Sequence, residues 1–285
     1  MQGSTVLDDL PEWLVLHEIL VRLPVKDVLR CRAVRRSWRS GTSTDAFTLD
    51  HHRHQPSLPI VKHREGICRV VIRGSNDLKI RPVLRWYASD AVIHRATCDG
   101  LLILSHQYKS DFYVCNPATR KCASLPHPPR RSDLRVSVAG FYRHQTSGEH
   151  RVLWVLYPWA YPSDLAVELL EYFVLTVGSD QPRCIQWPTV PEQRFIPAIW
   201  FRQCPAVHHQ GRLHWAMGLN ITVFDTIAET FRQMSRPTQL GDTVSLVDMD
   251  GALALCHTSS QCVTTLDVWV LQDYDAETWG LSLPD

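Results

Sequence analysis

The N-terminal segment 5–47 carries apolar side chains at the spacing of short helices. Asp9, Pro11 and Glu12 form a helix-start signal, in which an acidic N-cap is followed by Pro in the first turn. The apolar residues that follow recur three and four positions apart, and Pro24 ends this helix. The pattern predicts three short helices. The first carries more apolar surface than so short a domain can cover, which predicts a protein partner.

Beyond this segment the pattern changes to short apolar runs rich in β-branched and aromatic residues, separated by turn residues. Residues 48–66 are interpreted as a linker, and residues 67–285 as an all-β domain. The runs predicted as strands are CRVVIR (68–73), LLIL (101–104), FYVC (112–115), RVLWVLY (151–157), YFVLTV (172–177), ITVF (221–224) and LDVWVL (266–271).

The β-rich half also repeats itself. Each unit opens on a Gly that permits a positive φ, continues into a turn begun by Asn or Asp, and closes on a Pro. Short antiparallel strands repeating about every 50 residues are typical of β-propeller blades. Four units and a degenerate one near 67–90 are counted, so the ring is small or incomplete unless N-terminal strands close it. The markers are Gly100, Gly211 and Gly251, the tripeptide Ala-Glu-Thr at 228–230 and 276–278, and Pro126, Pro188, Pro237 and Pro284.

Composition narrows the class of protein. The chain has 285 residues, 45% of them hydrophobic and 21% charged, with a net charge of +1. This indicates a soluble protein and gives no reason to expect nucleic acid as a partner. No signal peptide and no membrane-spanning run is recognised, so a cytoplasmic or nuclear location is expected. Residues 242–285 carry eight Asp or Glu and no Lys or Arg, which is interpreted as a solvated face.

Neither catalytic nor metal-binding chemistry is predicted. The chain lacks the G-x-S-x-G, H-E-x-x-H, P-loop and G-x-G-x-x-G motifs. Nine cysteines show no C-x-x-C spacing, so no zinc site is expected and the thiols are expected to be reduced. The run His51, His52 and His54 has no acidic or Cys partner at ligand spacing nearby. We therefore expect a protein that is not an enzyme and that holds no cofactor.

The sequence LPEWLVLHEILVRLPVKDVLRCRAVRRSWRS resembles the F-box of plant F-box proteins in the order, spacing and type of its residues. The resemblance implies binding to the Skp linker subunit of an SCF (Skp–cullin–F-box) ubiquitin ligase, and through it to a cullin–RING ligase. One departure is Arg35, which stands where the family often has Cys. The implied linker contacts are Leu10, Pro11, Ile19, Leu20, Leu23, Pro24, Val28, Leu29, Val34 and Trp38.

The second half resembles the plant F-box-associated domain, a β-propeller. The matching pieces are CDGLL, NPATRKCASLP, GFYRHQTSGEHRVL, HHQGRLHWA, ITVFDTIAETF and LDVWVLQDYDAETW. Together the two resemblances imply a non-catalytic adaptor that holds a target protein near the ligase. Two alternatives remain: a propeller that binds its own small ligand, and an adaptor that does not direct degradation. Target contacts are expected from loops, with Trp159 and Tyr161 as candidates because an aromatic pair between prolines suits a buried strand poorly.

Overall fold

The computed structural model of the chain is described over most of its length and divides into two compact units. The first comprises Met1–Val92, Asp99–Leu101 and Asn116–Lys121, and the second comprises Ile93–Cys98, Leu102–Cys115 and Cys122–Asp285. The sequence-based limits at 47 and 66 remain predictions. The described residues are 10–55, 60–62, 68–74, 77–82, 92–106, 111–117, 119, 121–128, 133–158, 170–185, 206–217, 220–241, 244–249, 251–258 and 266–282.

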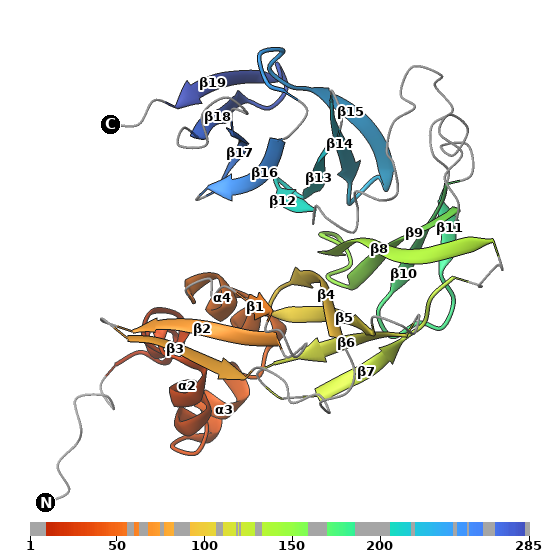
Figure 1. The fold of residues 1–285 in the computed structure, drawn as a ribbon. Helices are drawn as coiled ribbons and strands as arrows, with labels where there is room; N and C mark the ends of the chain where they lie inside the picture. Colours follow the sequence, from red (N-terminus) through yellow and green to blue (C-terminus); the bar gives the residue numbers. More distant parts are fainter. Residues whose placement is uncertain are drawn as a thin grey trace, which may run out of the picture. The chain divides into compact units, whose positions relative to one another are not determined.

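The N-terminal module is helical, as expected (Figure 1). The first helical stretch joins α1 (Glu12–Leu14), the π-helical η2 (Val15–Ile19) and the 3₁₀ turn η3 (Leu20–Arg22). Pro24 then starts α2 (Val25–Cys31), and α3 (Arg36–Gly41) follows. The carbonyl of Pro24 accepts the backbone N–H groups of Asp27 and Val28, so Pro24 serves as the N-cap of α2.

A fourth helix, α4 (Asp45–His54), extends into the segment interpreted as a linker. The hydroxyl of Thr44 accepts the backbone N–H of Phe47, which caps the first turn of α4. At the other end, the carbonyl of Leu23 lies 2.8 Å from Nε2 of His51 and accepts the amide of Gln55 at 3.1 Å. Pro24 cannot continue the preceding helix, and α4 supplies hydrogen-bond partners to the carbonyl exposed at this break.

The β-rich part forms separate sheets, each made of strands consecutive in the chain. A three-stranded sheet comprises β1 (Ile60–Lys62), β2 (Cys68–Gly74) and β3 (Asp77–Pro82). Four four-stranded sheets follow, confirming the propeller-like β class and the four sequence units. They are β4 (Val92–Cys98), β5 (Leu101–His106), β6 (Phe112–Asn116) and β7 (Lys121–Leu125); β8 (Leu134–Arg143), β9 (His150–Pro158), β10 (Glu171–Thr176) and β11 (Arg183–Ile185); β12 (Val207–His209), β13 (Arg212–Met217), β14 (Asn220–Asp225) and β15 (Thr230–Ser235); and β16 (Val244–Met249), β17 (Ala252–Thr258), β18 (Leu266–Asp273) and β19 (Thr278–Ser282).

Tight turns connect the first and second strands of several sheets. Asp99 and Gly100 have φ values of 47° and 77°, and Gln210 and Gly211 have 47° and 71°. Two consecutive positive φ values are the requirement of a type I′ hairpin turn, which explains the Gly that opens these two units.

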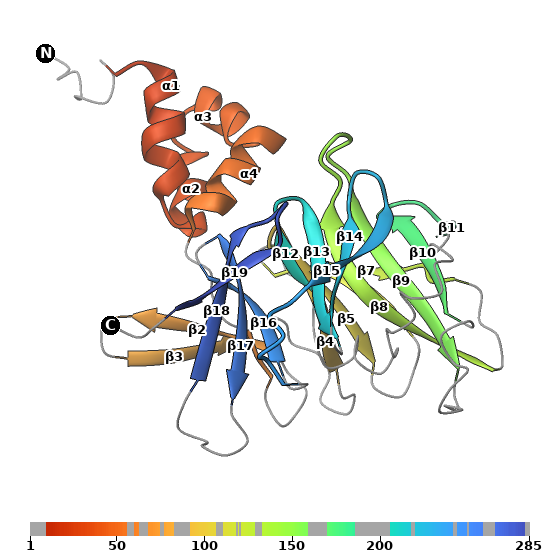
Figure 2. The same ribbon diagram turned by 90° about the horizontal axis from the view of Figure 1, so that it is seen from above.

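The sheets of the second unit pack face to face, with β12–β15 between β8–β11 and β16–β19 (Figures 1 and 2). On one side, Leu213, Trp215 and Phe224 are at most 1% exposed and pack against β8–β11. On the other side, Ile221 and Val223 are fully buried against β16–β19. A sheet that is apolar on both faces requires a neighbouring sheet on each face, which is why these three sheets stack.

One cysteine pair differs from the expectation of reduced thiols. Cys115 in β6 and Cys122 in β7 form a disulfide across the hairpin that joins the two strands. The prediction considered C-x-x-C spacing and missed two cysteines placed opposite each other on paired strands. Among the described residues, the free cysteines are Cys31, Cys98, Cys184 and Cys256.

Candidate functional site

The N-terminal helices enclose a small core and leave other large apolar side chains in solvent. The core comprises Val15, Leu20, Val21, Val28, Trp38 and Phe47, each at most 6% exposed. Outside it, Trp13, Val25, Leu29 and Val34 are between 43% and 66% exposed. Val25 and Leu29 lie one helical turn apart on α2 and therefore on one face. We call these four side chains the exposed apolar set.

The sequence-predicted linker contacts divide between this core and the surface. Leu20, Val28 and Trp38 lie in the core, where they hold the helices together. Leu10 and Leu23 are half-buried and pack against the same core. Ile19 is half-buried, whereas Pro11, Pro24, Leu29 and Val34 are exposed. Their binding role stays a prediction, but only the exposed ones offer substantial surface to a partner. The linker contacts predicted from the sequence omit Trp13 and Val25, because helical periodicity does not show which apolar face the other helices cover.

Two arginines support the third helix. The guanidinium of Arg32 donates to the hydroxyl of Thr42 at 3.0 Å and to its carbonyl at 2.6 Å. The guanidinium of Arg35 lies 5.3 Å from the centroid of the Trp38 ring, a cation–π arrangement. Arg35, the departure from the family pattern, therefore contacts the aromatic ring at the end of the motif.

The β14–β15 turn and the β18–β19 turn, which each follow the third strand of a sheet, share one geometry. Oδ1 of Asp225 accepts the backbone N–H groups of Ile227 and Ala228, both at 2.9 Å. In the equivalent turn, Oδ1 of Asp273 accepts the backbone N–H groups of Asp275 and Ala276, also at 2.9 Å. This confirms the predicted turn in which the first side chain bonds its own backbone.

The same geometry places a glutamate in the left-handed region of each turn, with a φ of 53° at Glu229 and 52° at Glu277. A non-glycine residue there is uncommon and costs conformational energy. These are the glutamates of the repeated Ala-Glu-Thr tripeptide. Each extends its side chain towards the preceding sheet.

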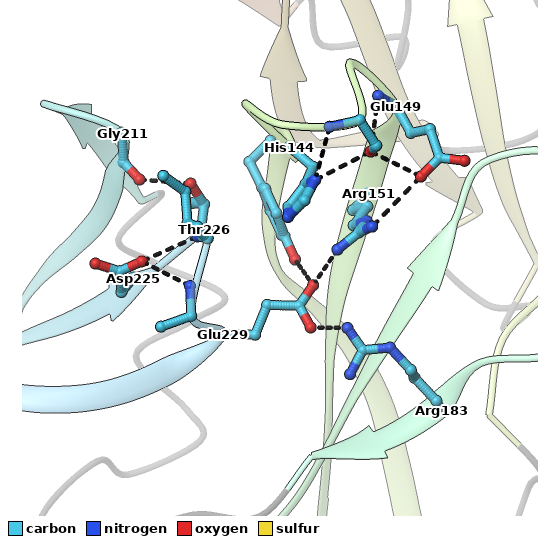
Figure 3. Close-up of polar contacts among 12 residues, drawn as sticks. His144, Glu149, Arg151, Arg183, Gly211, Asp225, Thr226 and Glu229 are labelled. Carbon is cyan, nitrogen blue, oxygen red and sulfur yellow. Dashed lines mark hydrogen bonds and ion pairs between the residues drawn. The ribbon is translucent and has the colours of Figure 1, made fainter.

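Glu229 joins β12–β15 to β8–β11 (Figure 3). Its Oε1 accepts the hydroxyl of Tyr142 at 2.9 Å and the guanidinium of Arg151 at 2.7 Å, and Oε2 pairs with Arg183. The Glu229 side chain is 8% exposed, so both carboxylate oxygens are compensated within the protein. We call this contact, with the apolar layer beneath it, the first joint.

Two groups near this contact have shifted pKa values, Tyr142 and Asp225, and Asp225 is labelled in Figure 3. Burial raises the pKa of Tyr142, although Arg151 and Arg183 oppose the shift, so Tyr142 stays a hydrogen-bond donor. Burial would raise the pKa of Asp225, but the backbone N–H groups of its turn and nearby Arg212 lower it overall. The Asp225 carboxylate is therefore held as a hydrogen-bond acceptor.

Glu277 joins β16–β19 to β12–β15 in a more exposed setting. Its Oε1 accepts the guanidinium of Arg232 at 2.7 Å, and its Oε2 accepts the backbone N–H of Ser235 at 2.7 Å. The side chains of Arg232 and Glu277 are 42% and 23% exposed. Nearby, the indole of Trp279 donates to the carbonyl of Ser235. We call this contact, with its apolar layer, the second joint.

The second joint also contains a buried histidine. Nδ1 of His214 lies 3.3 Å from the carbonyl of Val207, so this nitrogen carries the proton. Nε2 is then the acceptor, and the hydroxyl of Tyr274 donates to it at 2.8 Å. Burial lowers the pKa of His214 to about 3. The ring is therefore neutral near pH 7 and acts as a structural group.

The residues predicted to bind the target, Trp159 and Tyr161, lie outside the described residues. Trp154, inside the predicted strand RVLWVLY, is a fully buried residue of β9, and its ring meets Phe112 edge-on with the ring centroids 4.7 Å apart. Among the described helices, none has the length and apolar character needed to cross a membrane.

The sequence matches the F-box associated beta propeller domain over residues 85–282. F-box protein At5g49610 of Arabidopsis thaliana is 26% identical, over 94% of this chain and 76% of its own length. F-box protein At5g18160 of the same plant is 26% identical, over 92% of this chain and 67% of its own length. A solved structure, YCF48 bound to D1 peptide, aligns at 6% identity with a TM-score of 0.39, over 79% of this chain and 70% of that one. The chain belongs to the plant F-box proteins that carry an F-box-associated β-propeller domain.

Proposed function

We propose that this protein is a substrate-recognition adaptor of an SCF ubiquitin ligase. In this proposal the N-terminal helices dock onto a Skp-type linker, which connects the chain to a cullin–RING ligase. The β-rich domain binds a target protein. The observation that carries the proposal is the exposed apolar set, because soluble proteins seldom leave several large apolar side chains in solvent on so small a module unless a partner covers them.

The proposed role needs no covalent step by this chain. Holding a target near a ubiquitin-loaded enzyme raises the effective concentration of the two reactants, which is sufficient to promote transfer. Family membership and the absence of recognised catalytic motifs in the sequence support this reading.

The docking surface is tested by placing charge on exposed residues, which does not disturb the helical core. Leu29→Asp and Val34→Asp put a carboxylate on side chains that are 52% and 66% exposed. We expect each to weaken binding of a purified Skp-type linker to the full chain by about tenfold or more, measured by calorimetry. Ala46→Asp, on the exposed side of α4, is the matched control and should bind as the wild type does.

Binding by both variants within twofold of the wild type would remove the proposed docking surface. Circular dichroism of the variants checks that the helices are intact. Comparing the half-life of a captured target with and without the protein then separates a degradative adaptor from one that only assembles with the linker.

A further inference from the structure

The outer strand β7 has little apolar anchorage. It lies at one edge of the sheet β4–β7, where β6 is its neighbour in the strand order. Of its five residues, those from Lys121 to Ser124 are exposed, and Leu125 alone is buried. By comparison, the outer strand β15 of another sheet buries both Phe231 and Met234. Burial of apolar surface therefore contributes less to holding β7 in place than it does for β15.

The disulfide between Cys115 and Cys122 is a covalent fastening of this strand. Cys115 lies in β6, where it is fully buried and pairs with Leu102 of β5 in the strand register. Cys122 lies in β7 and is exposed. The bridge therefore connects the interior of the sheet to its weakly anchored edge strand. Because Cys122 is exposed, small thiols in solvent can reach that end of the bridge.

The hairpin between β6 and β7 keeps the two cysteines near each other when the bridge is broken. They are separated by only 7 positions in the chain. Within the turn, Oδ1 of Asn116 accepts the backbone N–H of Thr119 at 3.1 Å, so the turn has a stabilising contact of its own. Formation of the bridge from the reduced pair therefore closes only a short loop, which costs little chain entropy.

We propose that Cys115 and Cys122 form a reversible redox site, which fastens β7 when it is oxidised and releases β7 when it is reduced. The inference goes beyond the adaptor role and does not depend on it. Disulfides of proteins in reducing compartments usually serve as redox-sensing or catalytic groups. Here the pair combines an exposed cysteine, a short connecting turn and a strand that depends on the bridge.

The chemistry needs a small thiol in one direction and a peroxide in the other. A glutathione thiolate attacks Sγ of Cys122 and displaces the Cys115 thiolate, which takes up a proton. A second glutathione displaces the Cys122 thiolate, leaving two protein thiols and one oxidised glutathione. In the reverse direction, hydrogen peroxide oxidises the Cys122 thiol to a sulfenic acid and releases water. Attack by the Cys115 thiol then forms the bridge and releases a second water.

The test follows β7 in the full chain by hydrogen exchange and mass spectrometry, with the protein held in an excess of reduced or of oxidised glutathione. We expect maleimide labelling to show that the bridge is broken by reduced glutathione and restored by hydrogen peroxide. The backbone amides of residues 121–125 should exchange at least about tenfold faster in the reduced protein. Those of β14, in another sheet, should exchange at the same rate in both states.

Two cysteine variants make the test specific. Cys122→Ser removes the bridge at its exposed residue and places no polar group in the core. In this variant, residues 121–125 should exchange at the fast rate in both buffers. Cys184→Ser changes an exposed free cysteine in β11 and is the matched control, which should keep the redox response of the wild type.

A bridge that persists in reduced glutathione, or a reduced pair that hydrogen peroxide does not oxidise to the disulfide, would overturn the proposal. So would equal exchange of residues 121–125 in the two states, since pairing with β6 alone would then hold β7. Faster exchange of β14 on reduction would also overturn it, because the bridge would then support the fold as a whole and not one strand.

Discussion

The first and second joints use the same Ala-Glu-Thr turn in different surroundings. At the first joint, Glu229 is nearly enclosed and meets a tyrosine and two arginines. At the second, Glu277 is partly exposed and meets one arginine and one backbone N–H. Desolvation makes an unpaired charge costly, whereas solvent compensates an exposed one. The Ala-Glu-Thr tripeptide should therefore contribute more to stability at the first joint than at the second.

The largest effect is expected from Glu229→Gln. The neutral amide leaves Arg151 and Arg183 without their shared carboxylate, and Arg151 is only 16% exposed. Removing one partner of a buried pair typically costs 3–5 kcal/mol, and the exposure of Arg183 reduces this to about 2–3 kcal/mol. Urea unfolding of the full chain measures the loss. Glu149→Gln removes an exposed carboxylate from the same Arg151 and should leave the unfolding midpoint unchanged.

The next effect concerns pH and is specific to the second joint. The pKa of His214 falls from 6.5 to about 3 on folding, so the unfolded chain takes up a proton before the folded chain does. Titration of His214 therefore leaves folding unopposed above pH 6.5 and opposes it increasingly as the pH falls towards 3. Linkage gives about 1.4 kcal/mol per pH unit, or roughly 2 kcal/mol between pH 6.5 and 5.

His214→Gln removes the titrating group while keeping an acceptor for Tyr274. We expect the unfolding free energy of this variant to fall less than that of the wild type between pH 7 and 5. Parallel pH profiles for the two proteins would show that His214 does not distinguish the joints.

The smallest effect is expected from Glu277→Gln. Its partner Arg232 is 42% exposed, and pairs of this kind contribute about 0.5–1 kcal/mol. The urea midpoint should therefore shift by less than half of the shift produced by Glu229→Gln. Equal shifts would mean that burial does not decide the strength of these contacts.

Local chemistry was readable from the sequence because it acts over a few residues. The Gly markers predicted the hairpin turns, and Asp225 and Asp273 predicted the side-chain-bonded turns. Strands such as ITVF and LDVWVL were recognised because each continues for several apolar or β-branched positions.

Contacts between distant segments were not readable. The tripeptide at 228–230 gave no sign that Glu229 meets Arg151 and Arg183, because these arginines belong to another sheet. The disulfide was missed because Cys115 and Cys122 become neighbours only once their strands pair. The exposure of Trp13 was missed for the same reason, since the packing of other helices decides which apolar face stays uncovered.

The direction of the glutamate contacts matters for a chain made on a ribosome. Glu229 bonds to Arg151 and Arg183, and Glu277 bonds to Arg232, so each carboxylate meets an arginine that was synthesised before it. When a glutamate emerges, the sheet that holds its partner has already left the exit tunnel. A nascent chain can therefore add its sheets in order, each newly made one fastening to the one before it.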